Sequence, residues 1–266
     1  MNKPGGMDKA ATLRDLHKPL LVLPNAWDGA SARIFEEAGF PAIGTTSAGV
    51  AYALGYPDGE RLTRREMIEV VARIAKIVKI PVTADVEAGY GDPVQTARDV
   101  WEAGAVGMNL EDMTGDRQHE LEAQIATIRA IRAAAPKMVI NARTDIYLAS
   151  IGEESTRFDR TVERLNAYLE AGATCAFAPG VRDAATIERL VKAVRGPLNI
   201  LASAGAPDVA EMKRLGVSRM SVGSGPMRAT LGLVDRIAKE LRDHGTYRTM
   251  IDGAIPYADV NRLLTG

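Results

Sequence analysis

The stretch "PVTADVEAGYGDP", residues 81–93, begins as a buried strand and ends in acidic residues. Its first half is apolar up to Ala84, as a core strand requires. Asp85 and Glu87 then stand where the strand runs out, and glycines and a tyrosine follow at once. The acids add nothing to a hydrophobic core, so their role depends on the fold that the rest of the chain predicts.

Similar short apolar runs recur along the chain, separated by segments with helical spacing such as 65–78 and 160–172. The eight runs are 20–25, 42–47, 82–87, 107–112, 138–145, 174–180, 198–205 and 219–224. Several helical segments end in a glycine that can stop a helix: Gly39, Gly104, Gly172 and Gly216. The pattern predicts an α/β fold, a single (β/α)8 TIM barrel domain over residues 1–266, with an apolar helical extension at 243–266. The alternative is an open doubly wound sheet, but no glycine-rich dinucleotide fingerprint opens the first unit.

The composition excludes several classes of function. The formal net charge of −1 argues against a nucleic-acid or anionic-membrane surface. No apolar run approaches the ~20 residues of a membrane span, and the N-terminus lacks the apolar core of a signal peptide. The one cysteine, Cys175, allows neither an internal disulfide nor a thiolate metal cluster. We therefore expect a soluble cytoplasmic protein.

Polar residues gather at the carboxyl ends of four consecutive predicted strands, which is where the active site of such a barrel lies. They are Thr45, Thr46 and Ser47, then Asp85 and Glu87, then Glu111 and Asp112, then Arg143 and Asp145. Carboxylates crowded together raise one another's pKa unless a positive charge lies among them. Oxygen ligands without nearby His or Cys favour Mg²⁺, with Mn²⁺ as a possible substitute. The alternative is that the acids cap helices or pair with surface lysines.

Three further features lie at the predicted mouth of the barrel, the end at which the strands have their carboxyl ends. Each of them has two interpretations. Arg143 either forms a structural salt bridge with Glu111 or holds a substrate carboxylate with its planar fork. The small residues of "TTSAGVA", 45–51, let backbone N–H groups approach an anionic oxygen, although this signal is weak. Asp58 lies on a loop that could cover the mouth, but an aspartate before a glycine is more often part of a turn.

With these residues in place, the chain resembles the isocitrate lyase/phosphoenolpyruvate mutase superfamily, in its methylisocitrate lyase/carboxyphosphonoenolpyruvate phosphonomutase-like branch. The resemblance covers nearly the whole barrel through "LPNAWDGASARIFEEAGFPAIGTTSAGVA", "PVTADVEAGYGDP", "GMNLED", "NARTD" and "SVGSGPMRA". It implies a Mg²⁺-dependent enzyme that makes or breaks C–C or P–C bonds beside a 2-oxo acid through an enolate. It also implies that barrels pair by exchanging the eighth helix, so a homo-oligomer is expected, either a dimer or a dimer of dimers.

The resemblance assigns roles to individual residues. Asp85 binds the metal directly, and Glu87 and Glu111 reach it through water. The oxo acid is held by Ser47 and the backbone of Ala48 and Gly49, with Thr45 and Asn199 in the same substrate-binding set. Arg143 holds the substrate carboxylate, and the catalytic set comprises Ser47, Asp58, Glu111 and Arg143.

Departures from the family pattern leave the reaction open. Isocitrate and methylisocitrate lyases carry a cysteine as proton donor after strand four, whereas this chain has "EDMTGDRQHELEAQ", 111–124. The same lyases have a glutamate after strand six, where this chain has "FAPG" with Pro179, and the lysine lid of the mutases is also absent. His119, Arg117 and Tyr90 are the remaining proton-donor candidates, and a surface role for His119 is at least as common.

The preferred function is a Mg²⁺-dependent lyase that acts on a small 2-oxo or 2-hydroxy carboxylate by C–C cleavage or decarboxylation. One alternative is P–C chemistry on a phosphonate or phosphoenol substrate, and another is a catalytically silent 2-oxo-acid binder. In all three cases the partner is a small carboxylate. Without the lid cysteine, authentic isocitrate or methylisocitrate lyase activity is not expected.

Overall fold

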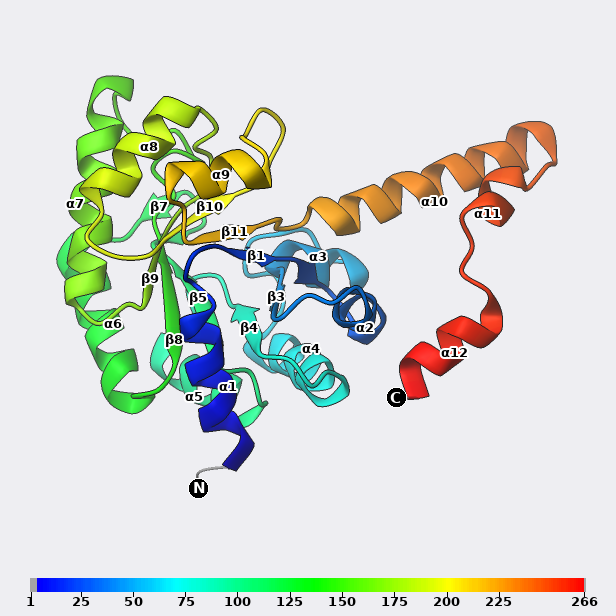
Figure 1. Ribbon diagram of the computed structural model, residues 1–266, viewed down its shortest axis with the longest axis horizontal. Helices are drawn as coiled ribbons and strands as arrows, with labels where there is room; N and C mark the ends of the chain where they lie inside the picture. Colours follow the sequence, from blue (N-terminus) through cyan, green and yellow to red (C-terminus); the bar gives the residue numbers. More distant parts are fainter. Residues whose placement is uncertain (1–3, 266) are drawn as a thin grey trace.

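A parallel barrel forms the body of the protein, seen in the computed structural model, which describes residues 4–265 (Figure 1). The strand order is β1-β11-β10-β9-β8-β5-β4-β3-β2, and every pair in this nine-stranded sheet is parallel. The strands are β1 (Leu21–Leu23), β2 (Asn25–Ala26), β3 (Ile43–Thr45), β4 (Val82–Asp85), β5 (Gly107–Glu111), β8 (Val139–Arg143), β9 (Cys175–Ala178), β10 (Leu198–Leu201) and β11 (Arg219–Ser221).

The two ends of this order, β1 and β2, are halves of one barrel strand interrupted at Pro24, whose missing N–H breaks the ladder. Asn25 closes the seam: its Nδ2 donates to Thr45 O at 2.7 Å, and its Oδ1 accepts from the N–H groups of Val222 and Gly223 at 2.9 Å each. The nine strands therefore fill eight barrel positions. The predicted TIM barrel is confirmed.

Helices cover the outside of the barrel, as their sequences predict. In α4 (Arg64–Ile77), Thr63 and Glu66 form a capping box, and Met67, Val71 and Ile74 are buried on one face. Gly39, Gly104, Gly172 and Gly216 all have positive φ, which confirms the predicted helix stops. The other helices of this layer are α2 (Gly29–Glu37), α5 (Pro93–Glu102), α6 (Leu121–Ala134), α7 (Glu154–Glu170), α8 (Ala184–Ala193) and α9 (Val209–Leu215).

An N-terminal helix, α1 (Pro4–Asp15), closes the floor of the barrel. Its Leu13 is fully buried and belongs to a small cluster with Leu21, Val106 and Val139, which stand at or beside the amino ends of their strands. Because α1 seals this end, the opposite, carboxyl end of the strands is left as the mouth.

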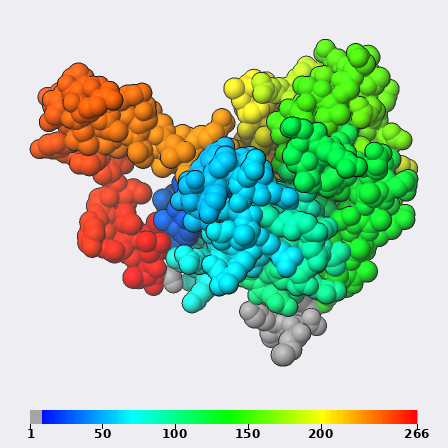
Figure 2. Space-filling view, turned by 180° about the vertical axis from the view of Figure 1, so that it is seen from behind, coloured from blue at the N-terminus to red at the C-terminus, as the bar shows by residue number. Residues whose placement is uncertain are grey.

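The C-terminal region leaves the barrel and returns to it. Helix α10 (Gly225–His244) runs outward, and α11 (Arg248–Asp252) and α12 (Tyr257–Thr265) turn back (Figures 1 and 2). Arg33 Nε of α2 donates to Leu263 O at 2.9 Å, which fixes α12 against the barrel. The arm exposes apolar side chains, including Leu231, Val234 and Leu241. Across residues 4–265, no helix is long and apolar enough to cross a membrane.

Candidate active site

Alternation along three neighbouring strands carries polar side chains into the barrel. On β5, Asn109 and Glu111 share one face, as Asn141 and Arg143 do on β8. The register pairs Asp85 with Asn109, and Glu111 with Arg143. The acids of strand ends three and four and the arginine of strand end five therefore meet at the mouth, as the sequence predicted.

Asp85 is held by hydrogen bonds to both carboxylate oxygens. Its Oδ2 accepts from the backbone N–H and the hydroxyl of Ser47, both at 3.0 Å, and its Oδ1 accepts from Asn109 Nδ2 at 3.3 Å. Thr45 Oγ1 accepts from the Asp85 N–H at 2.8 Å. These contacts fix the orientation of the Asp85 carboxylate, and the hydroxyl of fully buried Thr45 is used to hold the end of β4.

Helix α3 (Ser47–Ala53) starts directly at the mouth, with Thr46 as its N-cap. Thr46 Oγ1 accepts from the Gly49 N–H at 3.3 Å, so that amide already has a partner within the cap. A Cβ at Gly49 would lie 2.5 Å from Thr46 Cγ2, so the glycine is required for packing. Ser47 contacts Asp85, and Ala48 follows it in the first turn of the helix, so these two residues remain the candidates for contact with an oxo acid.

Arg143 forms two salt bridges at the mouth. Nη1 lies 2.8 Å from Glu111 Oε2 and Nε lies 2.8 Å from Asp145 Oδ1, so both interpretations of Glu111 and Arg143 remain compatible. Among the described residues Nη2 has no hydrogen-bond partner. Burial raises the pKa of Glu111 well above its usual range, against the opposing charge of Arg143. Burial alone would lower the pKa of Arg143, but the neighbouring acids outweigh it and raise that pKa.

Glu87 ties two loops together beside Asp85. Its carboxylate accepts from the Glu60 N–H and, at 3.1 Å, from the Tyr90 hydroxyl, while Glu60 Oε1 accepts from the Tyr90 N–H at 2.8 Å. All three residues have φ near +50°, a conformation that costs a non-glycine residue about 1–3 kcal/mol. Burial raises the pKa of Glu87 to about 7. Strain and a raised pKa in one cluster are typical of a functional site.

The loop that Glu60 anchors carries Asp58 to the rim of the mouth. The residue as a whole is exposed, yet its pKa is raised, first by partial loss of solvent and then by the charge of Asp85. Arg143 acts on the same carboxyl in the opposite direction. These interactions place the Asp58 carboxyl near Asp85 and Arg143.

Asp112 is the clear exception to the predicted set, because it faces away from the mouth. It is fully buried behind the strand ends and ion-paired with Arg164 at 3.1 Å. Five groups donate to it: Gln118 Nε2, Thr144 Oγ1, Arg164 Nη1, the Tyr168 hydroxyl and the Asp145 N–H. The expectation that Asp112 faces a ligand is therefore wrong, since every donor around it belongs to the protein.

The segment after β5 forms a short hairpin of β6 (Met113–Thr114) and β7 (Arg117–Gln118). His119 follows it, with Nε2 2.9 Å from Thr114 Oγ1 and Nδ1 3.1 Å from Gln124 Oε1. Both ring nitrogens therefore have protein partners. A hollow of about 300 Å³ lies between this hairpin and Glu60, lined also by Ala88, Gly91, Pro93, Thr114, His119, Gln124 and Thr127.

Two predicted residues lie deeper in the barrel. Cys175 is fully buried, as its place in an apolar strand predicts, and burial raises its pKa to about 12. Asn199, also fully buried, donates from Nδ2 to Ser221 Oγ at 3.2 Å.

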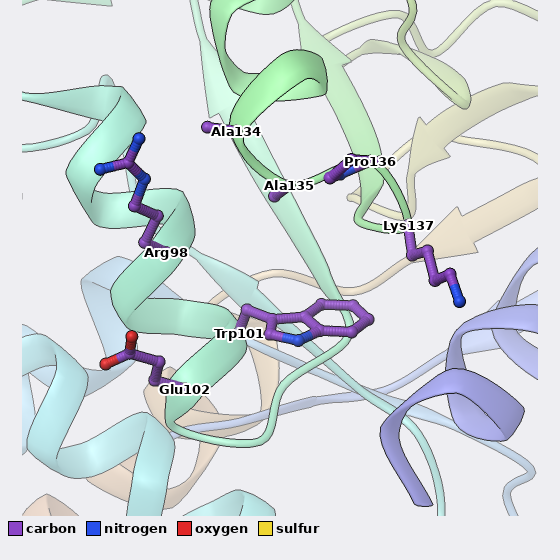
Figure 3. A pocket seen from close by; sticks show the side chains of 7 residues that line it. All are labelled: Arg98, Trp101, Glu102, Ala134, Ala135, Pro136 and Lys137. Atoms are coloured by element: carbon purple, nitrogen blue, oxygen red, sulfur yellow. The ribbon is translucent and has the colours of Figure 1, made fainter. Parts of the chain in front are cut away.

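A separate hollow of about 340 Å³ lies at the other end of the barrel, where Trp101, Arg98 and Lys137 line it between α5 and the start of β8 (Figure 3). Ala134, Ala135, Pro136 and Glu102 complete its wall.

The donor set at the mouth fits a hydrated magnesium ion. The described residues contain no cluster of three His, Cys, Asp or Glu side chains positioned to bind a metal directly. Magnesium does not need one, because it is usually held by one or two carboxylates and keeps several waters. Asp85 offers fixed oxygens, and the pKa values of Glu87 and Glu111 are raised partly by the neighbouring negative charges, which a dication would offset.

The sequence interpretation missed three groups of residues at this site. Asn109 and Asn141 lie one layer below Glu111 and Arg143, and a period-two reading of their strands would have found them. Arg219, inside the barrel, would have followed from the same rule applied to β11. Glu60 had no sequence signal, because its role depends on a contact across the fold.

A parallel barrel with polar side chains at the carboxyl ends of its strands has the arrangement in which TIM-barrel enzymes carry their active sites. Residues 13–242 match the family model for phosphoenolpyruvate phosphomutase, and the chain belongs to this family. The predicted superfamily is thereby confirmed.

Relatives with names span lyases and hydrolases. The "Probable 2-methylisocitrate lyase 1" of Corynebacterium glutamicum is 30% identical, over 86% of this chain and 80% of the relative. A Burkholderia cenocepacia J2315 crystal structure, for which a lyase or mutase activity has been suggested, matches with a TM-score of 0.92 and 35% identity over 99% of this chain and 98% of that one. Oxaloacetate acetylhydrolase in complex with its product oxalate matches with a TM-score of 0.86 and 28% identity over 99% and 95%.

Proposed function

We propose that this protein is a Mg²⁺-dependent lyase that acts on a small 2-oxo or 2-hydroxy carboxylate through an enolate-type intermediate, by C–C cleavage or decarboxylation. The observation that carries the proposal is the presence of both Asp85 and Arg143 at the same mouth. Asp85 is fixed by Ser47 and Asn109, and Arg143 is fixed by two acids, which leave its Nη2 without a hydrogen-bond partner within residues 4–265. One group suits a cation and the other suits a carboxylate.

In this proposal Asp85 holds the metal directly, and Glu87 and Glu111 contact it through water. When bound, Mg²⁺ or Mn²⁺ supplies a fixed positive charge beside the oxygen on which negative charge develops. These three acids suit Mg²⁺ because they offer only oxygen atoms as metal ligands.

The other residues bind and orient the substrate. Arg143 binds the carboxylate with charge-assisted hydrogen bonds, and Glu111 and Asp145 keep its fork in place. Ser47 and Ala48 lie beside Asp85, where an oxo group would be held. Asp58 approaches the reacting groups from the loop above.

The named relatives support a small 2-oxo or 2-hydroxy acid as substrate. One is called a methylisocitrate lyase, and another binds oxalate as the product of oxaloacetate cleavage. The family description favours P–C chemistry as the second candidate. That candidate needs more positive charge than Arg143 provides at the mouth, and the chain lacks the mutase lysine lid.

Turnover of a panel of C4–C7 2-oxo and 2-hydroxy diacids, with Mg²⁺ and with EDTA, tests the proposal. We expect Mg²⁺-dependent cleavage or decarboxylation of at least one diacid, and neither isomerisation nor hydrolysis of phosphonates. Turnover of phosphonates alone would favour the second candidate, and metal-dependent binding without turnover would favour a silent binder. Isocitrate and 2-methylisocitrate should react poorly, because the hairpin has no cysteine and Cys175 is buried.

We propose further that the C-terminal arm pairs two copies of the chain by helix exchange, in a dimer or a dimer of dimers. Helix α10 stands away from its own barrel and exposes Leu231, Val234 and Leu241 (Figure 1). Light scattering should give at least a dimer mass for the native chain and a smaller mass for Leu231→Glu/Val234→Glu. A monomer of the native chain would contradict helix exchange.

A further inference from the structure

The side chain of Arg219 crosses the interior of the barrel. It begins on β11 and is fully buried, and its Nη2 donates to Asn109 Oδ1 on β5 at 3.1 Å. In the strand order, β11 and β5 stand on opposite sides of the eight-position barrel. A long side chain is therefore needed to make this contact.

Arg219 is poorly compensated for a buried charge. Its Nε and Nη1 have no hydrogen-bond partner among the described residues, and no acid there forms a salt bridge with it. Burial lowers its pKa to about 10, so the guanidinium is still charged at neutral pH. A buried cation with unpaired donors is costly to the fold, so stability does not account for this residue.

Asn109 connects the guanidinium to Asp85. Asn109 Oδ1 accepts from both Arg219 and Asn141 Nδ2, the latter at 2.8 Å, which directs Asn109 Nδ2 toward Asp85 Oδ1 at 3.3 Å. These two contacts and the width of an amide place the cation within roughly 9 Å of the Asp85 carboxylate. The space between them is filled by protein, so solvent screens the charge weakly.

Arg219 and Arg143 differ in whether neighbouring acids neutralise their charge. The charge of Arg143 is taken up by salt bridges with Glu111 and Asp145. Within residues 4–265 Arg219 forms no salt bridge, and its charge acts on the neighbouring Cys175 thiol and on the Asp85 carboxylate. Its field therefore acts from below on the place where a metal would bind.

We propose that Arg219 is a positioning residue of the Asp85 site that acts through Asn109. Its buried positive charge offsets the charge of Asp85 and so weakens the binding of a divalent cation at the mouth when no substrate is present. The metal is then held firmly only together with an anionic substrate. This inference rests on the proposed metal role of Asp85. At an effective dielectric constant near 20, a unit charge at this distance changes the affinity for a dication about tenfold or more.

The test is calorimetry of Mg²⁺ binding to the full chain at pH 7.5, without and with oxalate. Arg219→Met removes the charge and should tighten Mg²⁺ binding about tenfold or more without oxalate, and reduce the gain from adding oxalate. Arg219→Lys keeps the charge and should remain within about threefold of the native affinity. Arg219→Gln is the second neutral variant, with the same expected tightening, in case the methionine variant does not fold.

A matched control and the contrary outcomes separate this inference from a general packing effect. Arg132→Met removes a different arginine, which is partly buried and donates to Gly172 O far from the mouth. This change should leave Mg²⁺ affinity unchanged. Unchanged or weaker Mg²⁺ binding in folded Arg219→Met or Arg219→Gln would overturn the inference alone. If the native chain binds neither Mg²⁺ nor oxalate, the proposed function fails, and this inference with it.

Discussion

Glu111 and Asp112 are neighbours in the chain, yet they belong to two regions with opposite electrostatics. Glu111 faces the mouth, where it shares Arg143 with Asp145 and burial raises its pKa. Asp112 faces the space between the barrel and α7, where five donors surround it, one of them the guanidinium of Arg164. Glu111 thus shares one arginine with a second acid, whereas hydrogen-bond donors surround Asp112. The comparison supports the proposal that the mouth receives a ligand, whereas the region behind it stabilises the fold.

The largest effect on stability should come from the satisfied acid. Asp112→Ala leaves Arg164 without its carboxylate and removes the acceptor shared by four further donors, so the free energy of unfolding should fall by about 3–5 kcal/mol. Urea denaturation measures it. The matched control is Glu111→Gln, which should stay within about 1 kcal/mol of the native protein but weaken oxalate binding. A larger loss in Glu111→Gln than in Asp112→Ala would reverse the comparison.

The second effect is a pH dependence of the metal-free protein. The pKa of Glu87 is about 7 in the fold, above its ordinary value of 4.5, so the native state keeps a proton that the unfolded chain has lost. The stability due to Glu87 is fully present below pH 4.5 and is lost as the pH rises through 7. Relative to Glu87→Gln, the native protein should lose about 3 kcal/mol between pH 4.5 and 8.

Denaturation of both proteins across this pH range measures the difference. The raised pKa values of Asp58, Glu111 and Asp145 occur in both proteins, so their effects largely cancel in the comparison. Parallel pH profiles for the two proteins would mean that Glu87 is ionised in the fold near its ordinary pKa.

The third effect concerns the substrate side of the mouth. Arg143→Lys keeps the charge but cannot contact Glu111, Asp145 and a substrate carboxylate at once. We expect kcat/KM to fall roughly 10–100-fold, or about 1.5–3 kcal/mol of transition-state stabilisation. Steady-state kinetics on the best diacid of the panel measures it. An unaltered kcat/KM would make Arg143 a purely structural residue.

The smallest effect should come from the hairpin. His119→Asn removes hydrogen bonds to Thr114 and Gln124 at the partly exposed edge of the mouth. The loss should be about 0.5–1.5 kcal/mol in stability, and turnover should slow less than threefold. If turnover instead slowed by about two orders of magnitude while the fold stayed intact, His119 would be the missing proton donor.

Much of the fold was predictable because each barrel unit has a local signal. Apolar runs gave the strands, and the glycines with positive φ gave the helix stops. The split of the first strand at Pro24 and the floor helix α1 were missed, since one depends on how the barrel closes and the other on a cluster of distant residues such as Leu13 and Val139.

The candidate site was predictable only in part, for a related reason. Asp85, Glu111 and Arg143 follow from their positions at strand ends. Asp112 was misplaced because adjacent residues of a strand end point to opposite faces, and the sequence interpretation took both acids together. The bonds among Glu60, Glu87 and Tyr90 join segments 30 residues apart and have no local signature.

The most direct test of the central claim is calorimetry of oxalate binding by the native chain with Mg²⁺, by the native chain with EDTA, and by Asp85→Ala with Mg²⁺. Oxalate offers the two adjacent oxygens of a 2-oxo acid and cannot react. We predict binding in the first case and loss of at least 100-fold in affinity in the other two, with far-ultraviolet circular dichroism showing an intact fold in Asp85→Ala. Equal oxalate affinity in Asp85→Ala, or in the presence of EDTA, would contradict the account.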